Sequence, residues 1–238
     1  MRAADIKRIH YGYFVAPDGY PDAGQPVPVT GFVIPDPAGT ILFDTGFSPF
    51  EDDVRQRYHP RYRPAREALT ESGVDPDSIT AIVNCHMHSD HSGGNHEFPG
   101  VPIYVQQIEL DNARTPDFTY PHYTCDFPGA TLEVVEGELE LRPGMLVVPT
   151  PGHTTGHQAL LVSTDDGIVM LAGQAAEIWR FSSAVFAERL EHELGDKIGE
   201  YPAWAALLRE RNVARAYLAH DLMVWERGVS PLGRPVVR

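Results

Sequence analysis

Cysteine, basic residues and long apolar runs are scarce in this chain of 238 residues. Its two cysteines, Cys85 and Cys125, are too few to cross-link a domain of this size. With 19 Lys and Arg against 33 Asp and Glu, the net charge is −14, and we expect no nucleic-acid partner. The chain has no N-terminal apolar leader and no apolar stretch long enough to span a bilayer, which predicts a cytoplasmic protein without a membrane span.

The 21 glycines and 21 prolines are spread through short turns, and no long-period repeat or low-complexity linker divides the chain. Hydrophobic residues make up 42%, enough for a sizeable core. We therefore expect residues 1–238 to form a single domain.

The order of expected elements indicates an α/β fold. Residues 1–46 contain three short runs rich in β-branched and aromatic residues, typical of an antiparallel meander. A helix is expected near residues 64–72, followed by an apolar strand at 80–85 and a second helix near Gly93 and Gly94. Later segments predict a strand leading into a helix at 101–110, strands at 131–136, 145–150, 157–164, 167–173 and 214–221, and a helix at 204–211. This order predicts a sandwich with sheets inside and helices outside.

The segment IVNCHMHSDHSGG places His86, His88, Asp90 and His91 within six positions at the end of an apolar strand. His86 and His88 are two apart, so their rings leave the same face of an extended chain. His153, in PGHTTG, is the natural third imidazole. Three imidazoles with an open fourth position form the arrangement in which zinc lowers the pKa of bound water to about 7.

Asp90 and His91 are adjacent and could hold a second ion if His220, in LAHD, joined them. A lone His153 or His220 would more often be a polar residue satisfied within the fold, and it is their placement at strand ends that favours a ligand role. Cys85, beside His86, is either a zinc ligand or a reduced thiol packed behind the motif, and the alternation of side chains along a strand favours the thiol.

These residues resemble the metallo-β-lactamase superfamily. HMHSDH and PGHTTGH, with ILFDTG before them and a strand-end His220 after them, carry the resemblance over roughly Ile6 to His220. HSGGNHEFPGVPIYVQQIE and VVPTPGHTTGHQALLV are most similar to the N-acyl-homoserine lactonase branch. The resemblance implies an αββα sandwich of two mixed β-sheets flanked by helices, with a dinuclear metal site at one edge.

The resemblance also implies a ligand set and two departures from it. One ion is expected on His86, His88 and His153, and a second on Asp90, His91 and His220. The family's bridging aspartate should lie in LAGQAAE, where this chain has Gln174. A neutral amide can lend only one carbonyl oxygen to two cations. Glu177 stands where lactonases usually carry a tyrosine that contacts the substrate. It is either a carboxylate that restores the charge lost at Gln174 or a solvated acid.

Other residues are expected to support the site or the substrate. Asp44 and His157 resemble residues that hold metal ligands in place, although each could equally be structural. Aromatic residues near the motif loops could line an acyl pocket or pack in the core: Phe118, Tyr120, Tyr123, Trp179 and Phe181. The aromatic stretch from Phe118 to Tyr123, with Phe127 just beyond it, is either a surface connection or a lid over an apolar ligand.

The function predicted from the sequence is hydrolysis of a lactone, with an N-acyl-homoserine lactone as the leading substrate. A metal-bound hydroxide would attack the carbonyl carbon, with Asp90 orienting it or carrying its proton and Glu177 as a further proton-transfer candidate. Zinc is the expected metal, with iron or manganese as alternatives. Thioester or β-lactam hydrolysis, or a degenerate ligand-binding module, are the competing interpretations. The oligomeric state stays open, a homodimer included.

Overall fold

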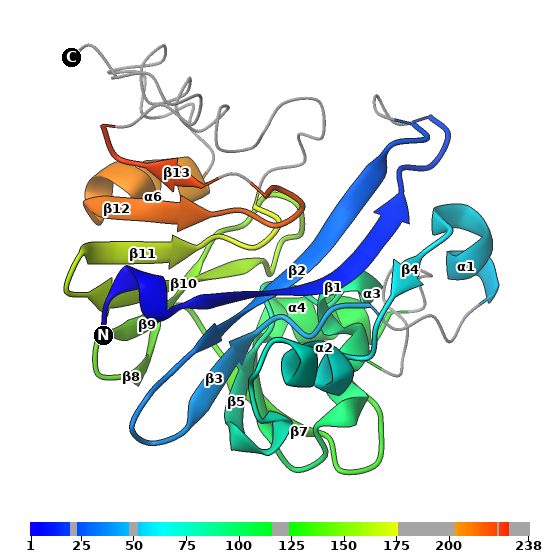
Figure 1. Cartoon of the computed structure of the whole chain (residues 1–238), viewed down its shortest axis with the longest axis horizontal. Coiled ribbons are helices and arrows are strands. Elements are labelled where there is room, and N and C mark those ends of the chain that lie inside the picture. Colours follow the sequence, from blue (N-terminus) through cyan, green and yellow to red (C-terminus); the bar gives the residue numbers. More distant parts are fainter. Residues whose placement is uncertain (20–22, 48–51, 116–123, 176–202, 223, 229–238) are drawn as a thin grey trace.

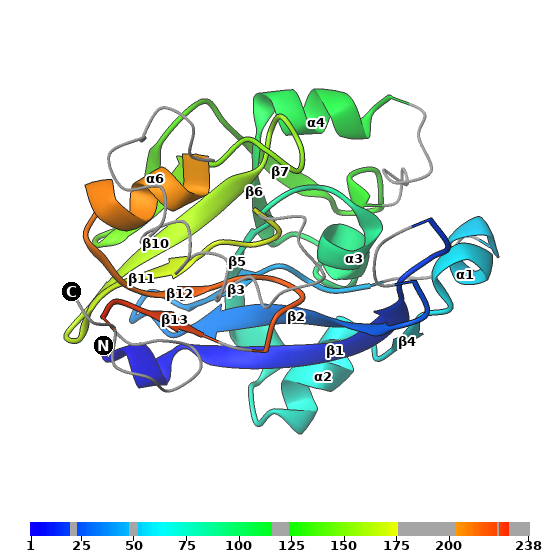
Figure 2. The ribbon, with the colours of Figure 1, turned by 90° about the horizontal axis from the view of Figure 1, so that it is seen from above.

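The computed structural model describes residues 1–19, 23–47, 52–115, 124–175, 203–222 and 224–228. Its core is two β-sheets that face each other (Figures 1 and 2). The seven-stranded sheet runs in the order β4 (Arg61–Tyr62), β1 (Lys7–Val15), β2 (Pro26–Ile34), β3 (Thr40–Phe43), β5 (Ile79–Val83), β6 (Pro102–Gln106) and β7 (Thr131–Val135). The six-stranded sheet runs in the order β13 (Trp225–Glu226), β12 (Val213–Tyr217), β11 (Gly167–Leu171), β10 (Gln158–Thr164), β9 (Met145–Pro149) and β8 (Leu139–Arg142).

Helices surround the two sheets (Figures 1 and 2). Within the described residues they are α1 (Asp52–Tyr58), α2 (Ala65–Glu71), α3 (Ser89–Ser92), α4 (Gln107–Ala113) and α6 (Ala203–Glu210), with short 3-10 helices η1 (Ala3–Asp5), η2 (Pro76–Ser78) and η3 (Gly93–Glu97). None of these helices is long and apolar enough to cross a membrane.

Three apolar layers hold the sandwich together. Phe43 of the first sheet and Leu171 of the second belong to the layer between the sheets. Leu69 of α2 packs against the outer face of the seven-stranded sheet, and Trp204 of α6 packs against that of the six-stranded sheet. Burying a large apolar side chain stabilises the fold by about 1.5–3 kcal/mol. The expected αββα sandwich of mixed sheets is confirmed.

Strand direction decides where the loops meet. Strands β1, β2 and β3 form the expected antiparallel meander, whereas β3, β5, β6 and β7 are parallel to one another. In the second sheet, β11 and β12 are also parallel. The carboxyl ends of parallel strands lie at one edge of a sheet, so the segments that follow β3 and β5 emerge together, as do those that follow β11 and β12.

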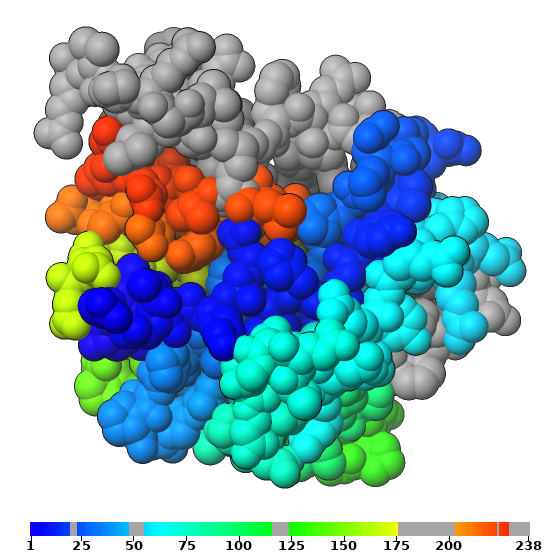
Figure 3. Space-filling view, in the orientation of Figure 1, coloured from blue at the N-terminus to red at the C-terminus, as the bar shows by residue number. Residues whose placement is uncertain are grey.

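The structure differs from the sequence predictions in detail. Strand β8 was not predicted, because LELR is short and holds no β-branched residue. The strand expected at 80–85 ends at Val83, since the backbone N–H of Cys85 donates to Asp44 instead of continuing the ladder. In the space-filling view, β1 fills the surface between β12 and β13 on one side and α2 on the other (Figure 3).

Candidate metal centre

Segments that follow strands β5, β9 and β12 bring six candidate ligands into two groups, in each of which the ligand atoms lie within 4.8 Å of one another. The first group is His86, His88 and His153, and the second group is Asp90, His91 and His220. The loop after β5 supplies His86 and His88 to the first group and Asp90 and His91 to the second, so this one loop contributes to both groups. The expected pairing of residues into two sets is present in the structure.

In the first group, three imidazole rings converge. The Nε2 atom of His153 lies 3.1 Å from Nδ1 of His88, and the ring centroids of His86 lie 4.5 Å from His88 and 4.7 Å from His153. His86 is fully buried, and the other two rings are half-buried. Nitrogen atoms at this spacing can face one shared cation.

In the second group, hydrogen bonds to other residues orient both imidazoles. Nδ1 of His220 donates to the carbonyl oxygen of Pro28 at 2.8 Å, which leaves Nε2 with its lone pair facing the group. The carboxylate Oδ2 of Asp90 lies 3.3 Å from Nε2 of His220 and 3.4 Å from Nε2 of His91. His220 adopts φ 62°, a left-handed conformation that is uncommon outside glycine.

Gln174 follows β11 and lies against the second group. Its Oε1 atom accepts a hydrogen bond from Nε2 of His91 at 3.0 Å, and the side chain is 4% exposed. The amide therefore stands beside the candidate ligands without carrying a charge. Gln174, at which the sequence departs from the family pattern, therefore lies beside the second group of the candidate metal centre.

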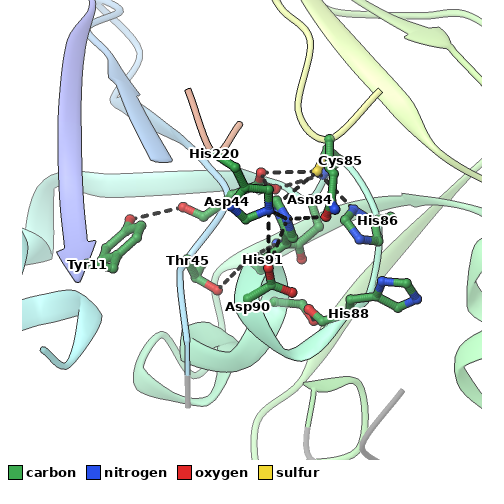
Figure 4. A network of polar contacts seen from close by, with 12 residues as sticks. Tyr11, Asp44, Thr45, Asn84, Cys85, His86, His88, Asp90, His91 and His220 are labelled. Carbon is green, nitrogen blue, oxygen red and sulfur yellow. Dashed lines mark hydrogen bonds and ion pairs between the residues drawn. The ribbon is translucent and has the colours of Figure 1, made fainter. Parts of the chain in front are cut away.

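Asp44 supports the centre from behind (Figure 4). It follows β3, is 1% exposed, and its Oδ2 accepts from Nδ1 of His91 at 2.9 Å. Its Oδ1 accepts from the backbone N–H of Cys85 at 2.8 Å, and the Cys85 thiol lies 3.1 Å from Nδ1 of His86. Asp44 and Cys85 thus contact one imidazole of each group. Cys85 is fully buried and forms no disulfide among the described residues, and its Sγ lies within 4.8 Å of ligand atoms of His86 and His157, so it is itself a candidate ligand.

Burial and neighbouring charges set the protonation of these groups. Burial, followed by the nearby imidazoles, lowers the pKa of His86 well below its usual value. Burial also lowers the pKa of His91, but Cys85, Asp90 and Asp44 outweigh it, so the net pKa is raised well above the usual value. For Asp90, burial raises the pKa, yet His91 and His220 hold it well below the ordinary range. Burial raises the pKa of Cys85 to about 12.

The residues fit divalent cations. The Nε2 atom of His86 is buried and has no hydrogen-bond partner among the described residues, a costly arrangement that a bound cation would relieve. The donor set of five imidazoles and one carboxylate suits zinc, iron or manganese. His157 is also fully buried. Its Nδ1 lies 2.7 Å from the Thr150 hydroxyl, and within the described part of the chain its Nε2 has no hydrogen-bond partner.

Glu177, Phe118, Tyr120, Tyr123, Trp179 and Phe181 lie outside the described residues. Phe127 is described and packs against the core beneath the seven-stranded sheet.

The sequence did not point to Glu109, which the structure places beside the metal loops. Its carboxylate is fully buried and contacts the segments that hold His86, His88 and His153. In the sequence it looks like one acid in the helix QIEL, and only its hydrogen bonds set it apart.

Comparison with known proteins also points to the metallo-beta-lactamase superfamily. The family model described as the metallo-beta-lactamase superfamily matches residues 24–178, more than half of the chain. An N-acyl homoserine lactonase from Bacillus sp is 37% identical over 109 residues, which cover 45% of this chain and 43% of that protein. The N-acyl homoserine lactonase AttM of Agrobacterium fabrum is 30% identical over 162 residues, covering 59% of this chain and 61% of that protein. The matches thus span less than two thirds of these relatives.

Solved structures share the fold over most of its length. A mutant of AiiA from B. thuringiensis, with N-decanoyl-L-homoserine bound at its active site, aligns with a TM-score of 0.70 at 23% identity, covering 93% of this chain and 95% of that one. AidC, a dizinc quorum-quenching lactonase, aligns with a TM-score of 0.60 at 18% identity, covering 91% of this chain and 87% of that one. The family match, the shared fold and the paired ligand groups agree: the chain belongs to the metallo-beta-lactamase superfamily.

Proposed function

We propose that the protein is a metal-dependent hydrolase that opens the ring of an N-acyl-homoserine lactone. The observation that carries this proposal is the convergence of two ligand groups on the loop after β5, where the ring centroids of His86 and His91 lie 4.3 Å apart. The names of the relatives, N-acyl homoserine lactonases, support the choice of substrate class.

His86, His88 and His153 would hold one divalent cation, and Asp90, His91 and His220 a second. When bound, such cations polarise the carbonyl group of the lactone ring as Lewis acids and lower the pKa of bound water. His86 is suited to this role because its lowered pKa keeps the imidazole neutral, with a nitrogen lone pair to offer.

Asp90 is the proposed proton carrier. Its pKa is held below the ordinary range, so the carboxylate is ionised at neutral pH. A carboxylate with a lowered pKa is a weak base, and it would accept a proton from the attacking water only because bound cations make that water more acidic. The water oxygen forms a bond to the carbonyl carbon of the lactone ring, the bond from that carbon to the ring oxygen breaks, and Asp90 returns the proton to the ring oxygen as it leaves. The products are a hydroxyl group and a carboxylic acid, which ionises and releases one proton for each ring opened.

A second candidate function is suggested by Gln174. Without a bridging carboxylate, the second group should hold its cation less tightly, and the protein would then be a ligand-binding module with little turnover. The first group keeps all three of its imidazoles and needs no bridging residue to hold a cation, which favours an enzyme.

The test combines metal counting with a substrate panel. Zinc-loaded wild type should hold at least one zinc per chain and release protons from N-acyl-homoserine lactones well above the buffer rate. His88→Ala should abolish this activity, while His10→Ala, the same change at an exposed position on β1, should not. Faster turnover of a thioester or a β-lactam would reassign the substrate. If the protein binds a lactone but hydrolyses it no faster than buffer alone does, the second candidate function, a ligand-binding module, would be correct.

A further inference from the structure

Helix α4 presents a buried carboxylate to both loops of the first group. Glu109 is 0% exposed, although acidic side chains are almost never fully buried unless their oxygens are satisfied. Its Oε1 accepts from the backbone N–H of Met87 at 2.9 Å, and its Oε2 accepts from the hydroxyl of Thr154 at 2.7 Å. One side chain therefore connects two segments that are far apart in the sequence.

The two donors are immediate neighbours of the proposed ligands. Met87 lies between His86 and His88, and Thr154 follows His153. Fixing the Met87 N–H and the Thr154 hydroxyl on one carboxylate fixes the separation of the loops after β5 and β9. The 3.1 Å approach of His153 to His88 depends on that separation.

The fit between α4 and the His153 loop is close and specific. A Cβ atom at Gly156 would lie 2.4 Å from the backbone N and from Cβ of Glu109, so only glycine allows this approach. One turn further along α4, the side chain of Asn112 donates to the Thr155 hydroxyl at 2.9 Å. Glu109 is thus held firmly against the loop that it contacts.

The chemistry of Glu109 also favours a cation. Both of its oxygens act as hydrogen-bond acceptors, as those of an ionised carboxylate do. A negative charge that is buried against the loops carrying the first group attracts a divalent cation more strongly than the same charge would at the surface. Residues that orient metal ligands in this way typically change metal affinity about 10–100-fold when they are replaced.

We infer that Glu109 is a positioning residue for the cation of the first group: it sets the spacing of His86 and His88 against His153 and strengthens cation binding through its charge. This inference rests on the metal centre of the proposed function. It does not depend on which substrate that centre hydrolyses.

The experiment measures zinc affinity of the full-length, metal-depleted protein by competition with a chromophoric chelator, with no substrate present. Glu109→Gln keeps the size of the side chain and removes its charge, and it should weaken the tightest zinc site about 10–100-fold. Thr154→Val removes one hydrogen bond and should weaken it by up to about tenfold. The matched control is Asp111→Asn, which removes an exposed carboxylate from the same helix and should leave zinc affinity unchanged.

A second readout separates positioning from general stability. Thermal unfolding of the metal-free variants should stay close to wild type while zinc affinity falls, and excess zinc should restore most of the lost lactonase activity of Glu109→Gln. If Glu109→Gln does not fold, Thr154→Val decides by the same zinc measurement. Wild-type zinc affinity in the folded variants, or a wild type that binds no zinc, overturns the inference. Zinc binding that depends on Glu109 in a protein that opens no lactone would refute the proposed substrate and leave the inference standing.

Discussion

Replacing Gln174 by Asp tests how the second group binds its cation. The side chain is 4% exposed, and its amide oxygen lies 3.0 Å from Nε2 of His91. A carboxylate at this position would place a negative charge beside the second group, whereas the amide offers a bound cation only a dipole. We therefore expect Gln174→Asp to raise the affinity of the second group for zinc.

The magnitude follows from charge and desolvation. Unit charges about 4 Å apart attract each other by about 4 kcal/mol at the effective dielectric constant of a partly buried site. Desolvation of the new carboxylate offsets a large part of this attraction. We expect a net gain of about 10–100-fold in zinc affinity, or about 1.4–2.8 kcal/mol. In the metal-free protein the sign reverses, because the new carboxylate loses solvation and is repelled by Asp90 and Asp44, which contact the same imidazole of His91. Attraction to His91, whose raised pKa favours the cationic form, offsets only part of this cost, so the fold should be destabilised by about 1–3 kcal/mol.

The assay is zinc titration and chemical denaturation, each on Gln174→Asp and Gln174→Asn. Asn has the length of Asp without its charge, so the difference between the two variants isolates the carboxylate. Lactone turnover at one and at two zinc equivalents then reports whether the second cation contributes to catalysis.

Equal zinc affinity in the Asp and Asn variants would refute the reasoning, since the charge would then not reach the second group. A metal-free Asp variant as stable as the Asn variant would show that the position is better solvated than its burial suggests.

Four further outcomes are expected. Zinc binding at the second group should release a proton from His91, whose pKa is raised, whereas binding at His86 should release none. Calorimetry in buffers of different ionisation enthalpy measures this, and second-group affinity should rise with pH. In the metal-free protein, the contribution of His91 to stability should be fully present below about pH 6.5 and lost as pH rises through the raised folded pKa, as denaturation over a pH series would reveal. Gly156→Ala should lower the free energy of unfolding by about 1–3 kcal/mol, because its Cβ would overlap Glu109, and Gly152→Ala, in the same loop but with room for a Cβ, is the packing control. Chelation should lower the stability of the zinc-loaded protein by about 2.7 kcal/mol if free zinc stood at 100 times its dissociation constant, and an unchanged melting temperature would contradict metal binding.

The sequence predicted the layers of the fold because hydrophobic periodicity is local. The meander of β1, β2 and β3 and the helix α2 follow from residues adjacent in the chain. Strand β8 escaped prediction because its short sequence has no such pattern.

The sequence by itself determined which ligands are available. His86, His88, Asp90 and His91 share six positions, and no folding is needed to see that one loop could serve two cations. The sequence also determined that a neutral residue, Gln174, stands where the family carries an aspartate.

Only the tertiary structure decided which atoms meet. Parallel strands bring the segments after β3 and β5 together, and the facing sheet supplies His153 and His220. The hydrogen bond from His220 to Pro28 spans 192 positions, and the contact between Glu109 and Thr154 spans 45. Such contacts leave no periodic pattern in the chain, because they depend on how separate elements pack and not on the residues next to each partner.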